Sequence, residues 1–258
     1  MKVVILAGGR GTRIIEESKH KPKPMIEIGG MPILWHIMKS YAYYGYNDFI
    51  ICAGYKQSII KEWFYHYFVN NNDITFDYTK GGMEMEIHDK HVEPWRVTVV
   101  DTGFETLTGG RIKRIQKYVG DETFLMTYGD AVCDVDITKL VEYHKSHGKI
   151  ATLTAVLQDQ TKGVLNIGGD YAVKSFREKQ ITDAAPINAG FMVLNPKIFD
   201  YIEGDMTIFE QDPLERVASE GELMSYLHKG FWQCMDTERE HEMLNELISK
   251  GTAPWIKW

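Results

Sequence analysis

The sequence predicts an α/β fold: a Rossmann-like, mostly parallel mixed sheet flanked by helices, with a small β-rich flap beside the ligand. Three observations lead to this prediction. Short apolar runs alternate with amphipathic segments over residues 1–156, which is typical of βαβ crossovers. Beyond residue 156 the apolar runs shorten and turn residues separate them, which indicates a lid on the main sheet. The 258 residues suffice for one elaborated domain.

The apolar runs of the first part predict strands over Val3–Ala7, Phe49–Ala53, Thr98–Val100, Phe124–Tyr128 and Ala151–Val156. The amphipathic segments between them predict helices over Ile33–Tyr44, Ser58–Phe68, Arg111–Val119 and Ile137–His147. In the second part, strands are expected over Val164–Ile167, Val173–Phe176, Ile187–Leu194, Leu223–His228 and Phe231–Met235, and a helix over Glu238–Lys250.

We therefore expect a single domain, 1–258, in three parts. Residues 1–156 would form the core, 157–236 a second part with a return to the sheet, and 237–258 a C-terminal helix with a tail.

Composition excludes several classes of protein. The net charge of −7 argues against a duplex nucleic-acid binder, which usually presents a basic face. The opening apolar run, Val3–Ala7, reaches glycine too soon for a signal sequence, and no apolar run approaches the ~18 residues that span a bilayer. A cytoplasmic protein with no membrane partner is expected. The three cysteines lie far apart and show neither a disulfide framework nor a zinc spacing.

Open α/β sheets bind ligands beyond the carboxyl ends of their strands, so the segments after Ala7 and Tyr128 are the first to consider. After the first strand, Gly8, Gly9 and Gly11 let the backbone turn tightly and bring its N–H groups close to an anion. Arg13 adds a charged planar fork, and Lys23 in a proline-stiffened segment adds a point charge. This combination favours phosphate binding, although it is neither a Rossmann nor a Walker sequence.

A carboxylate beside a triphosphate, just past a strand end, is suited to a hard cation. Asp130 follows the strand predicted at Phe124–Tyr128, and Asp236 follows an apolar run far along the chain. Helix capping is the favoured interpretation for Asp134 and Asp136.

Several motifs together resemble the sugar-1-phosphate nucleotidylyltransferases. They are residues 6–13, Lys21–Pro24, Tyr128–Asp130, Phe176–Lys179 and Asn188–Phe191. Within that family, residues 32–38, 92–95, 101–103, 108–111 and 253–255 are similar to the members that use CTP and glucose 1-phosphate. The resemblance covers essentially the whole chain. It implies transfer of a cytidylyl group to glucose 1-phosphate with Mg²⁺ and release of pyrophosphate, with 1–156 as the nucleotide-binding core and 157–236 as the sugar-binding part.

The resemblance also implies roles for individual residues. Arg13, Lys23 and Lys179 would be catalytic. The nucleotide would contact Leu6, Gly8, Gly9, Gly11, Thr12, Arg13, Lys23, Thr108, Gly109, Arg111, Gly129 and Asp130, with 108–111 against the base. Glu178, Lys179 and Asn188 would bind the sugar phosphate, and Asp130 and Asp236 would hold Mg²⁺. Related enzymes form homo-oligomers, and the aromatic segments 35–46 and 255–258 would lie either in a subunit contact or in the core.

Four alternatives stay open. Gln180 and Lys162 depart from the family pattern on the sugar side, so another phosphorylated acceptor is possible, and UTP or dTTP could replace CTP. A scaffold that binds nucleotide sugars without turnover is disfavoured because Lys23, Asp130 and Lys179 are all present. An NAD(P)-dependent oxidoreductase is disfavoured by the incomplete fingerprint.

Overall fold

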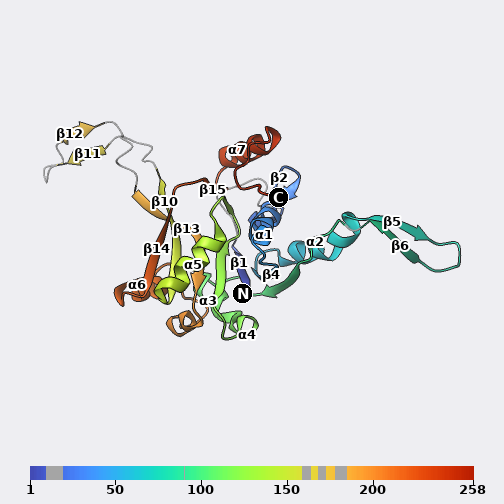
Figure 1. Ribbon diagram of the computed structural model, residues 1–258, viewed down its shortest axis with the longest axis horizontal. Helices are drawn as coiled ribbons and strands as arrows, with labels where there is room; N and C mark the ends of the chain where they lie inside the picture. The colour runs from blue at the N-terminus through green and yellow to red at the C-terminus, as the bar shows by residue number, and fades with distance from the viewer. Residues whose placement is uncertain (10–19, 90, 159–163, 168–172, 178–184) are drawn as a thin grey trace.

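A seven-stranded sheet forms the centre of the molecule (Figure 1). The computed structural model describes residues 1–9, 20–89, 91–158, 164–167, 173–177 and 185–258. From edge to edge the strands are β14 (Leu223–His228), β10 (Ala151–Gln158), β13 (Ala185–Leu194), β8 (Phe124–Tyr128), β1 (Val3–Ala7), β4 (Asp48–Ala53) and β7 (Arg96–Asp101). Only β13 runs antiparallel to its two neighbours, and the other adjacent pairs are parallel. The predicted fold class, a mostly parallel mixed sheet, is confirmed.

Helices cover both faces of this sheet. They are α1 (Ile33–Tyr43), α2 (Gln57–Asn70), α3 (Thr108–Arg114), α4 (Gln116–Val119), α5 (Ile137–His147), α6 (Asp212–Ser219) and α7 (Glu238–Ser249), with 3₁₀ turns η2 (Lys23–Met25) and η4 (Pro196–Tyr201).

The central strands are apolar along their whole length because both of their faces are buried. In β1, Val3, Ile5 and Ala7 belong to one core cluster, which includes residues of α1 and α5, whereas Val4 and Leu6 belong to a second, which includes residues of α3 and α6. The sheet is thus packed between two hydrophobic cores, which hold the carboxyl ends of its strands in place.

Four two-stranded ladders accompany the central sheet. The flap pairs β11 (Val164–Ile167) with β12 (Val173–Arg177), as expected. A second ladder pairs β2 (Glu27–Ile28) with β3 (Met31–Pro32), and a third pairs β9 (Ala131–Cys133) with β15 (Trp232–Cys234). The fourth, β5 (Asp73–Asp77) with β6 (Glu84–Asp89), is a hairpin that the sequence analysis did not predict.

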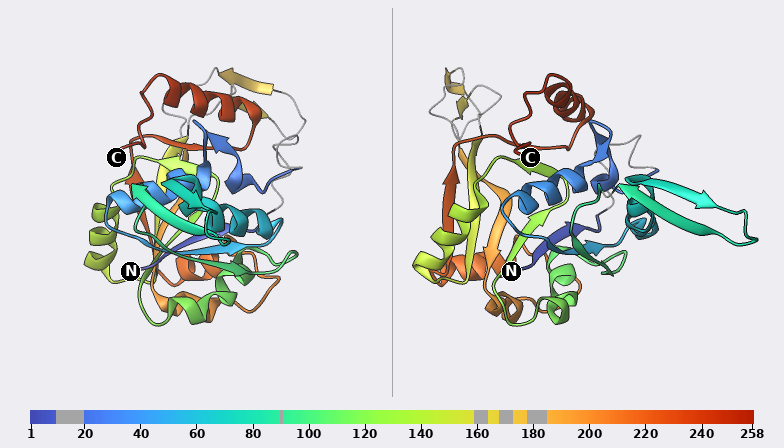
Figure 2. Two further views of the ribbon diagram at one scale, coloured as in Figure 1. Left: turned by 90° about the vertical axis from the view of Figure 1, so that its right-hand side faces the viewer. Right: turned by 45° about the vertical axis from the view of Figure 1, so that its right-hand side comes forward.

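The β5–β6 hairpin projects from the body as an arm, whereas the flap leaves the opposite side (Figures 1 and 2). The arm carries four large exposed apolar side chains, Phe76, Tyr78, Met83 and Met85. A two-stranded hairpin is marginal on its own in water. This exposed apolar surface therefore sets the arm apart from the body.

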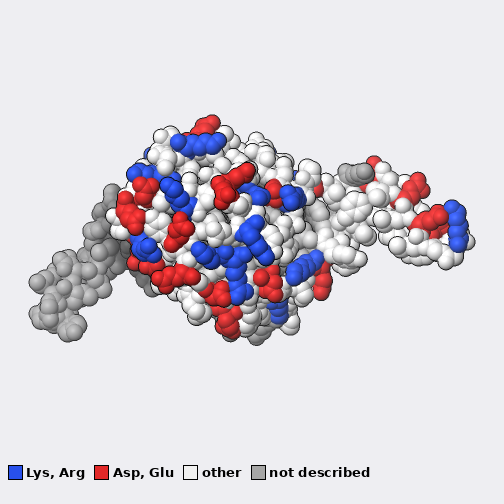
Figure 3. Space-filling view, turned by 90° about the horizontal axis from the view of Figure 1, so that it is seen from below, with Lys and Arg blue, Asp and Glu red and all other residues white. Residues whose placement is uncertain are grey.

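Charged side chains of both signs are interspersed over the face seen in Figure 3, including the tip of the arm. There Lys80 pairs with Glu84 at 2.9 Å. On this face the negative net charge is spread over the surface instead of forming one acidic field.

One aromatic residue of α1, Tyr41, and one of the C-terminal segment, Trp255, lie in the core, whereas Tyr43 and Trp258 are exposed. Tyr41 and Trp255 are fully buried, and the Phe231 ring stacks on Trp255. Of the two interpretations of these segments, core packing is the one that holds for these residues.

His36 on α1 is a buried histidine held in its neutral form. Its Nε2 donates to the carbonyl oxygen of Ile28 at 2.9 Å, and its Nδ1 accepts from the Trp255 indole at 3.4 Å. Burial lowers the pKa of His36 from 6.5 to about 4, and the bond to Ile28 opposes this only in part. Protonation would turn Nδ1 into a donor facing another donor.

This geometry predicts a loss of stability in acid. The unfolded chain binds a proton at His36 near pH 6.5 and the folded chain only near pH 4, so this contribution is complete above pH 6.5 and is lost as pH falls towards 4. The expected loss is on the order of 3 kcal/mol. Urea unfolding between pH 7.5 and 4.5 should show a weaker pH dependence in His36→Gln, whose amide can replace both hydrogen bonds.

His66→Gln, at an exposed position on α2, is the matched control and should keep the dependence of the wild type. Equal slopes in His36→Gln and the wild type would remove His36 as a source of the effect. His144, whose pKa is also lowered to about 4 by burial, would then be the next candidate.

Candidate active site

A cavity of about 380 Å³ opens at the carboxyl ends of β1 and β8, where the sequence analysis placed the ligand. Eight of the predicted nucleotide-binding residues line it: Leu6, Gly8, Gly9, Lys23, Thr108, Arg111, Gly129 and Asp130. Its wall also includes Ala7, Pro24, Thr106, Leu107 and Tyr128. Gly11, Thr12 and Arg13 lie outside the described residues.

Gly8 allows a guanidinium to lie directly against the loop that follows β1. A Cβ at this position would overlap the side chain of Arg111. The Gly8 carbonyl accepts from the Tyr55 N–H at 3.1 Å, which ties this loop to the segment after β4. The absence of a side chain at Gly8 is therefore a packing requirement as well as a means of close backbone approach.

Arg111 is a fixed positive charge in the wall of the cavity. It is 5% exposed, and its guanidinium donates to Thr102 Oγ1 at 2.8 Å and to the Gly103 carbonyl at 2.7 Å. Burial lowers the pKa of Arg111, but an arginine stays protonated in proteins. Since these partners are neutral oxygens, the charge remains available to attract an anion.

The structure brings Lys23, Asp130 and Asp236 together from three distant parts of the chain. Lys23 Nζ lies 2.6 Å from Asp130 Oδ2 and 2.6 Å from Asp236 Oδ1. The β9–β15 ladder makes this possible, because it sets Cys234 opposite Ala131 and lets the Met235 N–H donate to the Asp130 carbonyl at 2.8 Å. The predicted pairing of the two aspartates is a direct consequence of this ladder.

The Lys23 ammonium stands where a hard cation would be expected. Burial disfavours its charged form, but the two carboxylates outweigh burial, and the pKa of Lys23 is raised above its usual value. Two carboxylates that converge on one cationic atom offer the oxygen ligands that Mg²⁺ prefers, and phosphate oxygens and water would complete an octahedron. The donor set fits a divalent cation, provided that the ammonium moves aside.

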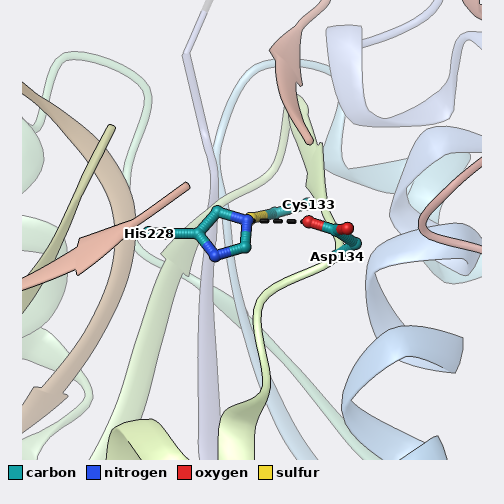
Figure 4. Close-up of side chains that lie close together, drawn as sticks. All are labelled: Cys133, Asp134 and His228. Atoms are coloured by element: carbon teal, nitrogen blue, oxygen red, sulfur yellow. Dashed lines mark hydrogen bonds and ion pairs between the residues drawn. The ribbon is translucent and has the colours of Figure 1, made fainter. Parts of the chain in front are cut away.

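Asp134 does not cap a helix, so this expectation is wrong. Its Oδ1 lies 2.7 Å from Nε2 of His228, at the end of β14, with Cys133 beside the pair (Figure 4). Burial raises the pKa of Cys133 to about 12, so its thiol stays protonated near neutral pH. The Asp134–His228 bond therefore ties β14 to the loop after β9. Asp136 does cap a helix, accepting from the Lys139 N–H at the start of α5.

Gly109 and Gly110 face a neighbouring segment that we call the strap, residues 204–210. A Cβ on Gly110 would overlap the backbone of Asp205, and one on Gly109 would lie 2.7 Å from the Thr207 carbonyl. Gly109 is the one predicted nucleotide-binding residue among the described residues that does not line the cavity. In the 108–111 motif, Thr108 and Arg111 reach the cavity and the glycines admit the strap.

On the sugar side only Asn188 can be placed, because Glu178 and Lys179 lie outside the described residues. Asn188 is an exposed residue of β13 whose side-chain oxygen accepts from the Gly190 N–H at 2.9 Å. Gly190 has φ +93°, and a Cβ there would lie 2.7 Å from the Tyr128 ring. Asn188 is thus held next to the aromatic wall of the cavity.

Sequence reasoning missed the residues that shape the wall. Tyr128 belongs to a motif named above but received no role there. Glu210, whose carboxylate accepts hydrogen bonds from the hydroxyls of Tyr128 and Thr108, does not figure in the sequence analysis at all. Glu210 lies 82 residues from Tyr128 along the chain, and nothing in its local sequence indicates that it turns towards this site.

Comparison with known proteins agrees with this geometry. The family model described as nucleotidyl transferase matches residues 2–238, and the chain belongs to that family. A relative from Salmonella typhimurium named glucose-1-phosphate cytidylyltransferase is 54% identical over 259 residues, which cover 100% of both chains. A Bacillus subtilis protein named probable glucose-1-phosphate cytidylyltransferase is 44% identical with the same coverage.

Among solved structures, HddC from Yersinia pseudotuberculosis matches with a TM-score of 0.70 at 25% identity, over 96% of this chain and 99% of that one. Within the described residues, no helix has the length and apolar character to cross a membrane.

Proposed function

We propose that this chain transfers the cytidylyl group of CTP to α-D-glucose 1-phosphate, giving CDP-glucose and pyrophosphate. The observation that carries the proposal is the cavity at the ends of β1 and β8, with Arg111, Lys23 and Asp130 in its wall and Asp236 paired with the same lysine. The relatives that match over their full length bear the name of this activity.

The reaction requires two anions to meet. A phosphate oxygen of the sugar phosphate attacks the α-phosphorus of CTP in line; the bond from that phosphorus to the bridging oxygen breaks, and pyrophosphate leaves. A phosphomonoester is a competent nucleophile near neutral pH because its second pKa is about 6, so the site needs no general base. Positive charge and orientation are the main requirements.

Each group has a place in this scheme. The N–H groups of the loop after Ala7, together with Arg13 and Lys23, would hold the triphosphate, and Lys179 would hold the attacking phosphate. Thr108 and Arg111 would lie against the base, and Glu178 and Asn188 would bind sugar hydroxyls. Asp130 and Asp236 would hold Mg²⁺, which neutralises charge on the phosphates when bound.

Product analysis tests the proposal. The protein would be incubated with CTP, Mg²⁺ and a panel of phosphorylated acceptors, and the products identified by mass spectrometry alongside a pyrophosphate assay. CDP-glucose formed from glucose 1-phosphate, with UTP and dTTP as weaker donors, is the expected result. A different CDP-linked product would move the proposal to another acceptor, and no cytidylyl product with any acceptor would refute it.

We further propose a homo-oligomer in which the β5–β6 arm packs against a second copy. The four exposed apolar side chains of the arm support this, since such surface enriches at interfaces. Sedimentation velocity of the wild type should give a mass above one chain, and Phe76→Ser with Met85→Ser should lower it. A wild type that sediments as a monomer at a protein concentration of about 50 µM would contradict the proposal.

A further inference from the structure

Two hydroxyls in the cavity wall donate hydrogen bonds to the same carboxylate. Tyr128 O–H donates to Glu210 Oε1 at 2.6 Å, and Thr108 Oγ1–H donates to Glu210 Oε2 at 2.6 Å. Both lengths fall in the range of charge-assisted O–H···O⁻ bonds, which are about twice as strong as neutral ones. Tyr128 ends β8 and Thr108 begins α3, so Glu210 bridges two sides of the cavity.

The strap holds Glu210 in this position through backbone bonds to α3 and the residue before it. The Leu107 N–H donates to the Asp205 carbonyl at 2.9 Å, and the Gly109 N–H donates to the Thr207 carbonyl at 2.9 Å. The Phe209 N–H donates to Thr108 Oγ1 at 2.9 Å. Thr108 therefore accepts from one residue of the strap and donates to the next, which sets the direction of its hydroxyl proton.

This arrangement decides which hydrogen bonds the wall can offer. A hydroxyl has a single proton, and a carboxylate accepts but does not donate. With both protons committed to Glu210, Tyr128 and Thr108 can meet a ligand only through their lone pairs. The part of the wall formed by these two hydroxyls thus suits ligand groups that donate, such as the 4-amino group of cytosine or a sugar hydroxyl, and it disfavours the 4-oxo group of uracil.

We propose that Glu210 is a positioning residue that determines specificity, by fixing Thr108 and Tyr128 as acceptors towards a ligand that presents an amino group and hydroxyls. The assignment of the amino group to the base rests on the proposed function, in which Thr108 lies against cytosine. Glu210 acts through the two hydroxyls and does not line the cavity itself.

The test compares CTP and UTP affinities by isothermal titration calorimetry of the full chain with Mg²⁺. Glu210→Met removes both acceptors at similar volume and frees both hydroxyls to donate. The ratio of UTP to CTP dissociation constants should fall by about tenfold, the effect of roughly one hydrogen bond. A parallel loss of affinity for both nucleotides, with the ratio within twofold of the wild type, would show a merely structural role and overturn the inference.

Control variants separate a specific effect of Glu210 from a general loss of folding. Glu215→Met, at an exposed position on α6, should keep the wild-type ratio. If Glu210→Met does not fold, as judged by thermal melting, Thr108→Val and Thr108→Ser replace it: valine should lower the ratio and serine, which keeps the hydroxyl, should retain it. Equal ratios in these two variants overturn the inference.

The inference and the proposed function fail in different ways. A wild type that binds CTP and UTP equally contradicts the role of Glu210 while leaving cytidylyl transfer possible. A wild type that favours CTP and yet forms no CDP-glucose contradicts the proposed acceptor or reaction and leaves the base selection by Thr108 standing.

Discussion

Lys23→Met is expected to lower kcat with CTP and glucose 1-phosphate by roughly 10²–10³, the effect of removing one charge-stabilising contact from an active site. The side chain keeps most of its length and loses only the ammonium that lies 2.6 Å from both Asp130 and Asp236. Steady-state rates of pyrophosphate release measure the change. The loss should appear in kcat as well as in kcat/KM, because the charge acts on the transition state.

The same variant should bind metal more tightly in the absence of nucleotide. In the wild type the ammonium occupies the position between the two carboxylates, and a cation has to displace it. Without it, Mn²⁺ binding followed by electron paramagnetic resonance should strengthen by about tenfold or more.

Lys21→Met is the control, because Lys21 belongs to the same lysine–proline segment but pairs with the half-exposed Glu27 at 2.8 Å. Exposed pairs contribute at most about 1 kcal/mol, so this variant should retain rate and metal affinity. Wild-type kcat in Lys23→Met would rule out a catalytic role for the lysine, and unchanged Mn²⁺ affinity would rule out its competition with the cation.

Asp236→Asn is expected to raise the Mg²⁺ concentration for half-maximal rate by at least about tenfold. Asparagine keeps the shape and one neutral oxygen but removes a negative charge from a two-carboxylate site, and Mg²⁺ is held chiefly by carboxylates and phosphates. A metal titration at saturating CTP measures the shift, and Mn²⁺ binding in the presence of CTP gives a second readout that does not depend on turnover.

Asp134→Asn is the matched control for this experiment. It lies four residues after Asp130 in the same part of the chain, but its carboxylate is engaged by His228 at 2.7 Å. Its metal titration should follow that of the wild type. Coincident titration curves for Asp236→Asn and the wild type would return Asp236 to a structural role, in which it pairs with Lys23.

The centre of the sheet could be predicted because its strands β1, β4 and β8 are almost entirely buried and apolar. The strand limits at Val3–Ala7 and Phe124–Tyr128, for instance, agree with the structure. The arm escaped prediction because its two strands pack on no core and so show no consistent burial pattern. Helix α6 was missed as well, since its eight residues carry only three buried side chains.

Site residues could be predicted where a single short segment of the sequence contains the groups that the chemistry requires. Gly8, Gly9 and Lys23 line the cavity as expected. By contrast, the role of Glu210 depends on a strap brought to α3 by tertiary contacts, and no local pattern encodes that approach. The Lys23 bridge between the two aspartates is likewise a tertiary outcome, because it joins residues 107 and 213 positions apart.

The β9–β15 ladder would make the proposed cation site an indicator of how completely this part of the chain has folded. Two three-residue strands bring Asp130 and Asp236 together, so loosening that ladder would separate the two carboxylates without altering either of them. The amide proton of Met235, bonded to the Asp130 carbonyl, reports this opening directly. The hydrogen-exchange rate of this amide should slow when metal and nucleotide bind. The change in rate would measure local opening of the β9–β15 ladder.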